Sequence, residues 1–176
     1  FGTNASKNAK NKENWSRCAT LQGHTMDVLD IDWSPRGFLA SASIDNTVMI
    51  WDCKSTGQPG SAPICNAIHV LRQHENYVKG VSFDPLGKYL LSSGSDNLLC
   101  VWDADTWTLA EKLEGPMKDS QDVSCSLFRR VSWAPDGQGV AATACTKSNR
   151  PVGMIIRRGT WESVTDLVGH QQPSLS

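Results

Sequence analysis

The stretch LQGHTMDVLDIDWSPRGFLASASIDNTVMIWD at residues 21–52 recurs in altered form as LRQHENYVKGVSFDPLGKYLLSSGSDNLLCVWD at residues 71–103. Each copy holds a His, an alternating apolar run, a Pro turn, a small-residue run, an Asp-Asn pair and an apolar run that ends in Trp-Asp. His24 and His74 lie about fifty residues apart, and we attribute this long period to a loop around the stretch STGQPGSAP. Self-similarity at such a spacing predicts a repeat architecture.

Residues 28–33, VLDIDW, alternate between polar and apolar side chains, a period of two that is typical of β-strands. The turns at residues 34–37 and 84–87 each join two strand-like runs, because Pro presets φ and Gly accepts a positive φ. Four short strands per repeat predict one blade of a propeller. The pattern of His, Asp-Asn and Trp-Asp resembles the WD40 signature, so the predicted fold class is an all-β WD40 β-propeller.

The WD40 resemblance implies a buried hydrogen-bonded tetrad in each regular blade. The matching sets are His24, Ser41, Asp45 and Trp51, followed by His74, Ser92, Asp96 and Trp102. We interpret both sets as structural groups that satisfy one another's hydrogen bonds. A hydrolytic triad is disfavoured, because the same trio recurs in both repeats and no nucleophile elbow accompanies it.

A third, divergent unit begins near Leu127 and keeps a first strand, the turn at residues 134–137 and a small-residue second strand. It has neither the leading His nor the closing Trp-Asp, and TKSNRPVG at residues 146–153 predicts a longer polar turn. We expect a looser blade, held mainly by apolar contacts, whose loops are free to contact a partner. The predicted organisation is a polar inter-strand loop (1–16), a WD blade with a trailing loop (17–63), a second WD blade (64–106), the divergent blade (107–168) and the start of another blade (169–176).

About three blades fall short of the four to eight that close a propeller ring. The sequence therefore predicts an incomplete ring from a longer chain, for which the WD40 resemblance implies seven blades. On its own, such a segment exposes two unpaired sheet faces, and we expect it to be poorly soluble.

The composition excludes several classes of function. Seventeen basic and eighteen acidic residues give a net charge of -1, which disfavours direct DNA binding and attachment to an anionic membrane. Six cysteines include no CxxC pair, and we expect reduced thiols, although their even number leaves disulfides open. Four histidines, two of them in tetrads, and the absence of a Gly-rich phosphate loop predict no metal, cofactor or small-molecule substrate.

Two stretches outside the generic repeat are more specific. Residues 1–24, FGTNASKNAKNKENWSRCATLQGH, resemble an insert of the HIRA family of histone chaperones and of its relative, the middle subunit of chromatin assembly factor. GMIIRRGTWESVTDLVGH at residues 153–170 resembles the divergent fifth blade of the HIRA family.

This resemblance covers nearly the whole chain, from Phe1 to His170. It implies a nuclear WD40 scaffold subunit of a histone chaperone complex, active in replication-independent nucleosome assembly and transcriptional regulation. It also implies a ubinuclein-type subunit, other chaperone subunits and core histones as partners. A generic WD40 adaptor, such as a ubiquitin-ligase substrate receptor, is the alternative, and an enzyme is the least favoured class.

Partner-binding positions follow from counting back from the turn Pro of each unit and from the residue after the turn Asp. The candidates are Asp27, Leu29, Asn46, Tyr77, Lys79, Asn97, Leu127, Arg129 and Arg130. Tyr and Arg are favoured at interface hot spots. The Arg129-Arg130 pair suits an acidic partner segment, while the alternative is that one Arg only forms a salt bridge with a neighbouring blade.

Overall fold

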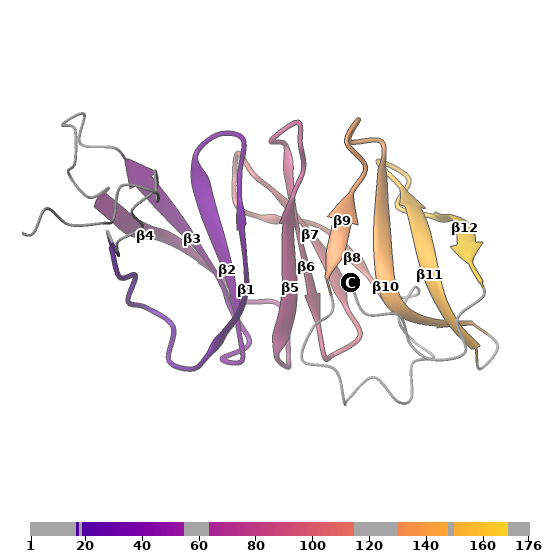
Figure 1. Ribbon diagram of the computed structural model, residues 1–176, viewed down its shortest axis with the longest axis horizontal. Helices are drawn as coiled ribbons and strands as arrows, with labels where there is room; N and C mark the ends of the chain where they lie inside the picture. The colour runs from indigo at the N-terminus through magenta and orange to yellow at the C-terminus, as the bar shows by residue number, and fades with distance from the viewer. Residues whose placement is uncertain (1–16, 18, 55–63, 115–129, 148–149, 169–176) are drawn as a thin grey trace, which may run out of the picture.

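A computed structural model describes residues 17, 19–54, 64–114, 130–147 and 150–168, and these ranges form β-strands and turns (Figure 1). The strands are β1 Val28–Trp33, β2 Phe38–Ser43, β3 Val48–Lys54, β4 Ile64–Leu71, β5 Val78–Phe83, β6 Tyr89–Gly94, β7 Leu99–Asp103, β8 Leu109–Leu113, β9 Val131–Trp133, β10 Gly139–Lys147, β11 Arg150–Arg157 and β12 Ser163–Leu167. Within the described ranges no helix is long and apolar enough to cross a membrane.

The strands form three four-stranded antiparallel sheets, in the orders β1-β2-β3-β4, β5-β6-β7-β8 and β9-β10-β11-β12. The sheets follow one another along the long axis of the molecule (Figure 1). An all-β fold and an incomplete β-propeller of about three blades are therefore confirmed.

The sheets do not end where the sequence units were expected to end. β4 is the outer strand of the first sheet, and β8 is the outer strand of the second. The predicted boundaries at 63/64 and 106/107 therefore each separate an outer strand from its own sheet. Each of these predicted units starts with the strand that completes the preceding sheet, so predicted units and sheets are offset by one strand. The predicted units 1–16 and 169–176 lie outside the described residues.

Neighbouring sheets pack face against face through apolar side chains. We call the side of a sheet that faces the preceding sheet its front, and the opposite side its back. The back of the first sheet and the front of the second share a core that includes Ala40, Ala42, Val48, Ile50, Val81, Phe83, Leu90 and Trp102. The back of the second sheet and the front of the third share a core that includes Leu91, Leu99, Val101, Val131, Trp133, Val140 and Ile156.

The first strands of adjacent sheets are also joined through polar groups. The carboxylates of Asp30 and Asp32 on β1 accept hydrogen bonds from the backbone N–H groups of Val81 (3.1 Å) and Phe83 (2.6 Å) on β5. The indole N–H of Trp133 on β9 donates to the Ser82 carbonyl at 3.2 Å. These bonds fix the register between sheets, which apolar packing alone does not specify.

The front of the first sheet has no preceding sheet among the described residues. Ile31 and Trp33 on this front are 59% and 56% exposed, whereas Val81 and Trp133 at matching positions of the later sheets are 4% and 9% exposed. The same strand positions are thus apolar in every sheet but are covered only where a preceding sheet lies against them. This face meets the expectation of an unpaired sheet face at the first blade.

The third sheet differs from its prediction. β10 and β11 pair from Gly139 with Arg157 as far as Lys147 with Arg150, so most of the stretch TKSNRPVG belongs to two long strands. The expected long polar turn at residues 146–153 is therefore wrong. Cross-strand pairing of two β-rich runs outweighed the turn preference of the polar residues between them.

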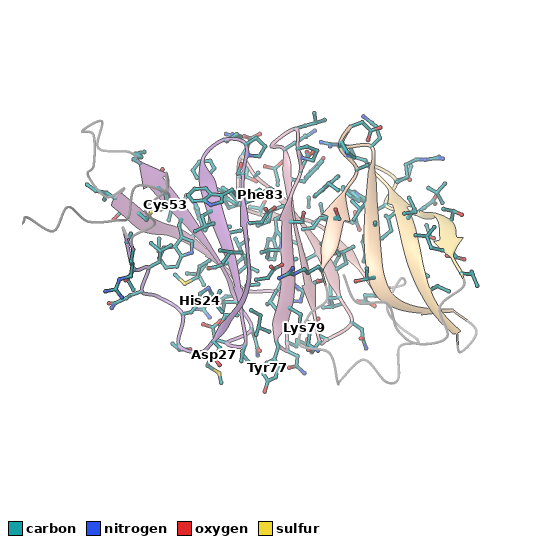
Figure 2. All side chains as sticks on the ribbon, in the orientation of Figure 1. His24, Asp27, Cys53, Tyr77, Lys79 and Phe83 are labelled. Atoms are coloured by element: carbon teal, nitrogen blue, oxygen red, sulfur yellow. A yellow bond between two sulfur atoms is a disulfide. The ribbon has the colours of Figure 1, made fainter. Side chains whose placement is uncertain are left out.

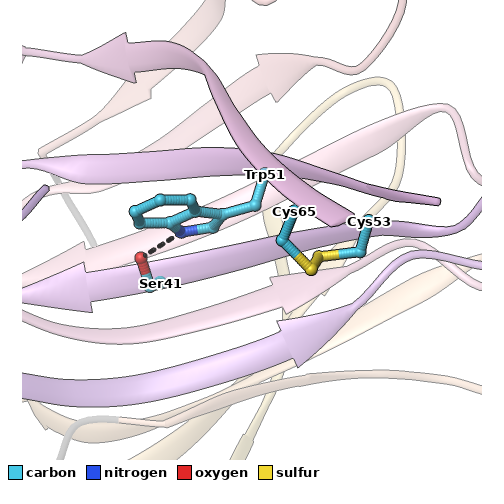
Figure 3. Close-up of a disulfide and its surroundings, with 4 residues drawn as sticks. All are labelled: Ser41, Trp51, Cys53 and Cys65. Atoms are coloured by element: carbon cyan, nitrogen blue, oxygen red, sulfur yellow. Dashed lines mark hydrogen bonds between the residues drawn. A yellow bond between two sulfur atoms is a disulfide. The ribbon is translucent and has the colours of Figure 1, made fainter. Parts of the chain in front are cut away.

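The cysteines also depart from expectation. Cys53 on β3 and Cys65 on β4 face each other in the ladder and form a disulfide (Figure 3). The expectation of reduced thiols is wrong for this pair, because the β3-β4 register, which the sequence does not reveal, places the two side chains opposite each other. Cys100 is a free, buried thiol.

Candidate partner-binding site

The first tetrad joins the loop before β1 to the turn between β2 and β3. Asp45 lies 2.9 Å from Nδ1 of His24, and Ser41 lies 2.7 Å from the Nε2 atom of the same ring. The indole N–H of Trp51 on β3 donates to Ser41 Oγ at 2.9 Å. A proton on Nδ1 of the imidazole satisfies the whole chain of bonds, because Ser41 then donates to Nε2 and accepts from the indole.

The second tetrad repeats this geometry in the second sheet. His74 Nδ1 lies 2.9 Å from Asp96 Oδ2, and its Nε2 lies 2.8 Å from Ser92 Oγ. Trp102 Nε1 donates to the same hydroxyl at 2.8 Å. A Cβ atom at Gly94 would approach His74 Nδ1 to 2.6 Å, so the close approach of this strand to the ring requires glycine.

Both tetrad carboxylates are held ionised. Burial alone would raise the pKa of Asp45, but hydrogen bonds from the Thr47 hydroxyl, the Thr25 amide and His24 outweigh burial and leave the pKa well below its usual range. Burial would likewise raise the pKa of Asp96, but hydrogen bonds from His74 and from the backbone N–H groups of Glu75 and Leu98 outweigh burial and lower it. In both tetrads the carboxylate and the imidazole are hydrogen-bonded to each other. We call each tetrad a structural clamp, because it joins the loop before a sheet to a turn of that sheet.

Each clamp fixes loops at one end of the molecule. We call this the tetrad end, comprising residues 24–27, 44–47, 74–77 and 95–98; Figure 2 shows His24, Asp27 and Tyr77 there and Cys53 and Phe83 toward the opposite end. The backbone carbonyls of Asp27 and Tyr77 accept bonds from the amides of Ile44 (3.0 Å) and Ser95 (2.8 Å). Their side chains are exposed, Tyr77 by 43%. Two candidate residues are thus held rigidly and face solvent.

Asn46 and Asn97 occupy the same place in successive turns and are half-buried. Their φ angles are 67° and 62°, in the left-handed region that Asn tolerates better than most residues. The Asn46 amide donates to the Glu75 carbonyl of the second sheet at 3.3 Å. Asn46 therefore links two sheets at the tetrad end in addition to presenting part of its side chain there.

Two other candidates are less accessible. Leu29 is half-buried on β1, and Lys79 on β5 is only 3% exposed. Strand alternation does not separate Lys79 from Tyr77, because residues two apart share a face. The difference is that Tyr77 lies in the loop before β5, whereas Lys79 lies within β5, where the β5-β6 ladder shifts between Val78 and Gly80. Lys79 is a part of the packed interior and does not present its ammonium group to solvent.

The predicted arginine pair is only partly described, because Leu127 and Arg129 lie outside the described residues. The side chain of Arg130 is 51% exposed, and its Nε atom lies 3.5 Å from Asp30 Oδ1. Burial raises the pKa of Asp30 above its usual value, and the Val81 amide and the Arg130 charge offset only part of that effect. For Arg130, the geometry corresponds to the alternative of a salt bridge between sheets.

Residues that sequence reasoning missed lie at the opposite end. Arg158 of the third sheet forms an ion pair with the fully buried Asp84 of the second. No local signal in the sequence connects Arg158 with a residue that lies 74 positions away. Among the described residues, no group of three or more His, Cys, Asp or Glu side chains could hold a metal ion.

Comparison with known proteins assigns the repeats. Residues 15–52 and 65–103 match the family model described as WD domain, G-beta repeat. The chain contains WD40 repeats. Both WD40 matches include a complete tetrad, whereas the third sheet lies outside them.

Three relatives locate the WD40 segment within larger proteins. The chain is 36% identical to Protein HIR1 of Cryptococcus neoformans over 162 residues, which cover 92% of this chain and 17% of that protein. It is 34% identical to Protein HIRA of Caenorhabditis elegans over 165 residues, which cover 93% of this chain and 17% of that protein. It is 36% identical to one of the subunits of chromatin assembly factor 1 from Mus musculus over 157 residues, which cover 81% of this chain and 26% of that protein. The resemblance to HIRA and to chromatin assembly factor is confirmed, and the chain spans between 17% and 26% of the length of these relatives.

Proposed function

We propose that this chain is part of a WD40 scaffold subunit, not an enzyme, in a nuclear histone chaperone complex for replication-independent nucleosome assembly and transcriptional regulation. The observation that carries the proposal is identity of 34% to 36%, across most of the chain, to HIR1, HIRA and the chromatin assembly factor 1 protein. The name of the last relative states a role in chromatin assembly. In the described residues, the tetrad groups that could serve catalysis are bonded to one another, which also supports a scaffold.

The proposed partners are a ubinuclein-type subunit, other chaperone subunits and core histones, reached directly or through the complex. We place the docking site at the tetrad end, on Asp27, Tyr77, Asn46 and Asn97. The clamped loops make this surface rigid, and a rigid aromatic anchor loses little conformational entropy on binding. Arg130, beside this end, offers its remaining exposed surface to an acidic group.

Affinity purification of the full-length protein from nuclear extract, followed by mass spectrometry, tests the complex. We expect core histones together with a ubinuclein-like protein. Recovery of a cullin-linked adaptor without histones would instead assign the chain to ubiquitin-ligase substrate receptors. Deposition of histones on plasmid DNA, measured by supercoiling while DNA synthesis is blocked, then tests replication-independence.

Two substitutions in the full-length protein test the docking site. Tyr77→Ala should weaken capture of the co-purifying subunits at least about fivefold, as expected for an interface residue whose truncation costs more than about 1 kcal/mol. Leu86→Ala is the matched control, because Leu86 is 61% exposed at the opposite end. Equal capture by both variants would move the docking site away from the tetrad end. Charge reversal at Arg129 and Arg130 with unchanged capture would remove that pair from the site.

A further inference from the structure

The outer edge of the first sheet differs from the other outer edges. β4 pairs with β3 on one side, and its other side carries no strand among the described residues. β8 and β12 are the corresponding outer strands of the second and third sheets. An outer strand presents a row of backbone N–H and C=O groups that only water or a further strand can satisfy.

The sequence of β4 lacks the usual protection of such an edge. Natural edge strands are commonly blunted by charged side chains, Lys above all, or by Pro. β8, LAEKL, carries Glu111 and Lys112, and β12, SVTDL, carries Asp166. β4, ICNAIHVL, has eight residues instead of five and contains no Lys, Arg, Asp, Glu or Pro.

Apolar side chains on β4 face solvent. Ile64 is 59% exposed and Ile68 is 39% exposed. Val70 is 42% exposed but lies opposite Met49 on the front of the sheet, where a preceding blade would cover it. Ile64 and Ile68 therefore carry the inference, because their exposure does not depend on the front face.

Ile68 lies at a β-bulge, but the bulge is not what distinguishes β4 from the other outer strands. In the ladder between β3 and β4, Ile50 pairs with His69 and Trp51 pairs with Ala67, so no residue of β3 pairs with Ile68. The ladders of the other two sheets shift at the corresponding place and pass over Ala110 and Val164. All three edges share this bulge, so the difference between them lies in length and charge.

β4 is also held firmly in its sheet. The disulfide from Cys65 to Cys53 ties it to β3 (Figure 3). The His69 ring lies 5.9 Å from the Trp107 ring of the second sheet, and Leu71 is 5% exposed in the shared core. A preorganised strand adds little ordering cost when another strand pairs with it.

We propose that the outer edge of β4, which carries no further strand among the described residues, binds an extended, uncharged segment of a partner protein as a fifth strand of the first sheet. Backbone hydrogen bonds supply the affinity, and Ile64 and Ile68 select apolar or β-branched side chains at alternate positions. A charged segment is disfavoured, because its ions would lose water without finding an opposite charge on β4. This inference goes beyond the proposed function, because it holds whichever complex the protein joins.

Hydrogen exchange on the full-length protein, alone and in its purified complex, tests the strand addition. Alternate amides within residues 64–71 should exchange at least about tenfold more slowly in the complex, since the outward-facing N–H groups gain partners. Residues 109–113 and 163–167 should exchange equally in both samples. Equal exchange of residues 64–71 in the two samples overturns the proposal.

Photocrosslinking identifies the occupant. A benzoylphenylalanine at position 64 of the full-length protein should crosslink to an uncharged segment of another subunit. Crosslinks to a second copy of the same chain mean self-pairing of the edge, and crosslinks to a lysine-rich histone segment mean charged recognition; either result overturns the proposal. Histone recovery by the unmodified protein is scored separately, so failure here is distinguishable from failure of the proposed function.

Lysine substitutions at the shared bulge position supply matched controls. Ile68→Lys should reduce binding of the crosslinked subunit at least about tenfold, because an edge lysine opposes strand addition. Ala110→Lys and Val164→Lys place the same charge on the other outer strands and should leave binding within about twofold. An unchanged thermal midpoint shows that each variant is folded. Equal effects of all three lysines, or none from Ile68→Lys, would remove the β4 edge from the interface.

Discussion

Arg158 donates a hydrogen bond from Nη2 to Oδ2 of Asp84 at 2.7 Å, and the Asp84 side chain is completely buried between the second and third sheets. The guanidinium also donates to the Gly137 carbonyl at 2.9 Å and lies over the rings of Tyr89 and Trp133, 5.1 and 5.5 Å from their centroids. The third sheet lacks a tetrad, yet it is fastened by a buried ion pair and not by apolar contacts alone. The core shared with the second sheet is apolar, as expected for this blade, and the buried ion pair adds a polar contact that the sequence did not indicate.

Arg158→Ala should destabilise the chain by about 3–5 kcal/mol, because it leaves the Asp84 carboxylate buried without its counter-charge. The chain supplies its own control: Ser34 and Ala104 occupy the matching positions in the preceding pair of sheets. The double variant Asp84→Ser with Arg158→Ala should therefore recover most of the loss. Urea denaturation measures the free energies of unfolding, and a double variant as unstable as Arg158→Ala would contradict this account.

Acid should weaken the fold through Asp84, Asp45 and Asp96. Burial opposes ionisation of each, but hydrogen bonds and charge from Arg158, Thr47 and the tetrad imidazoles lower the pKa below its ordinary value. A lowered carboxyl pKa contributes stability that is complete above the unfolded-state pKa of about 4 and is lost as the pH falls through the folded-state value.

The thermal midpoint should therefore be nearly constant down to about pH 5 and fall below it. Asp45→Asn should start from a lower midpoint and show a shallower decline, since one of the titrating carboxyls is gone. A variant and a parent that decline in parallel between pH 5 and pH 2 would show that Asp45 is not one of the groups responsible.

Trp33→Ala and Trp133→Ala should differ sharply, although the two residues occupy the same strand position. Trp133 is 9% exposed and bonded to Ser82, so its loss should cost about 3–5 kcal/mol. Trp33 is 56% exposed, and its loss from this chain should cost less than about 1 kcal/mol. In a longer protein that supplies a preceding blade, Trp33→Ala should become as costly as Trp133→Ala. Similar costs in the short chain, measured by urea denaturation, would mean that the front of the first sheet is already covered.

Removal of the Ser92 hydroxyl from the second tetrad should lower the stability of the fold, although only one oxygen atom is lost. Ser92→Ala leaves the indole N–H of Trp102 and Nε2 of His74 without their shared partner, and a loss of about 1–3 kcal/mol is expected. Ser132→Ala is the control, because Ser132 is an exposed strand serine. Equal thermal midpoints for the two variants would show that the tetrad does not stabilise the second blade.

Cys53, Cys65 and Cys100, whose side chains the structure describes, should differ in the conditions under which iodoacetamide alkylates them. In the folded chain iodoacetamide should label none of Cys53, Cys65 and Cys100, the first two because they are bonded to each other. After mild reduction Cys53 and Cys65 should react, whereas Cys100 should react only on unfolding, because burial and the nearby Asp96 charge raise its pKa to about 12. Mass spectrometry of the labelled peptides measures this order, and labelling of Cys53 before reduction would contradict the disulfide.

Much of this architecture was readable in the sequence. The alternation in residues 28–33, the turn glycines and the repeated pattern predicted strands and four-stranded blades, because each depends on residues close together in the chain or on a pattern that occurs twice. Both tetrads were implied by the WD40 resemblance, whose His, Ser, Asp and Trp residues recur in the two repeats. Tyr77 and Asp27 followed as exposed loop residues from the same repeat.

Only the tertiary structure decided which strand closes each sheet, that Cys53 meets Cys65, that Lys79 is buried and that Arg158 reaches Asp84. The physical reason is that register and sheet packing bring together groups that are distant in sequence. The residues next to a single cysteine, lysine or arginine in the sequence do not indicate which distant residue it will contact after folding. A hydrophobic period or a turn glycine, in contrast, indicates local structure from a few neighbouring residues.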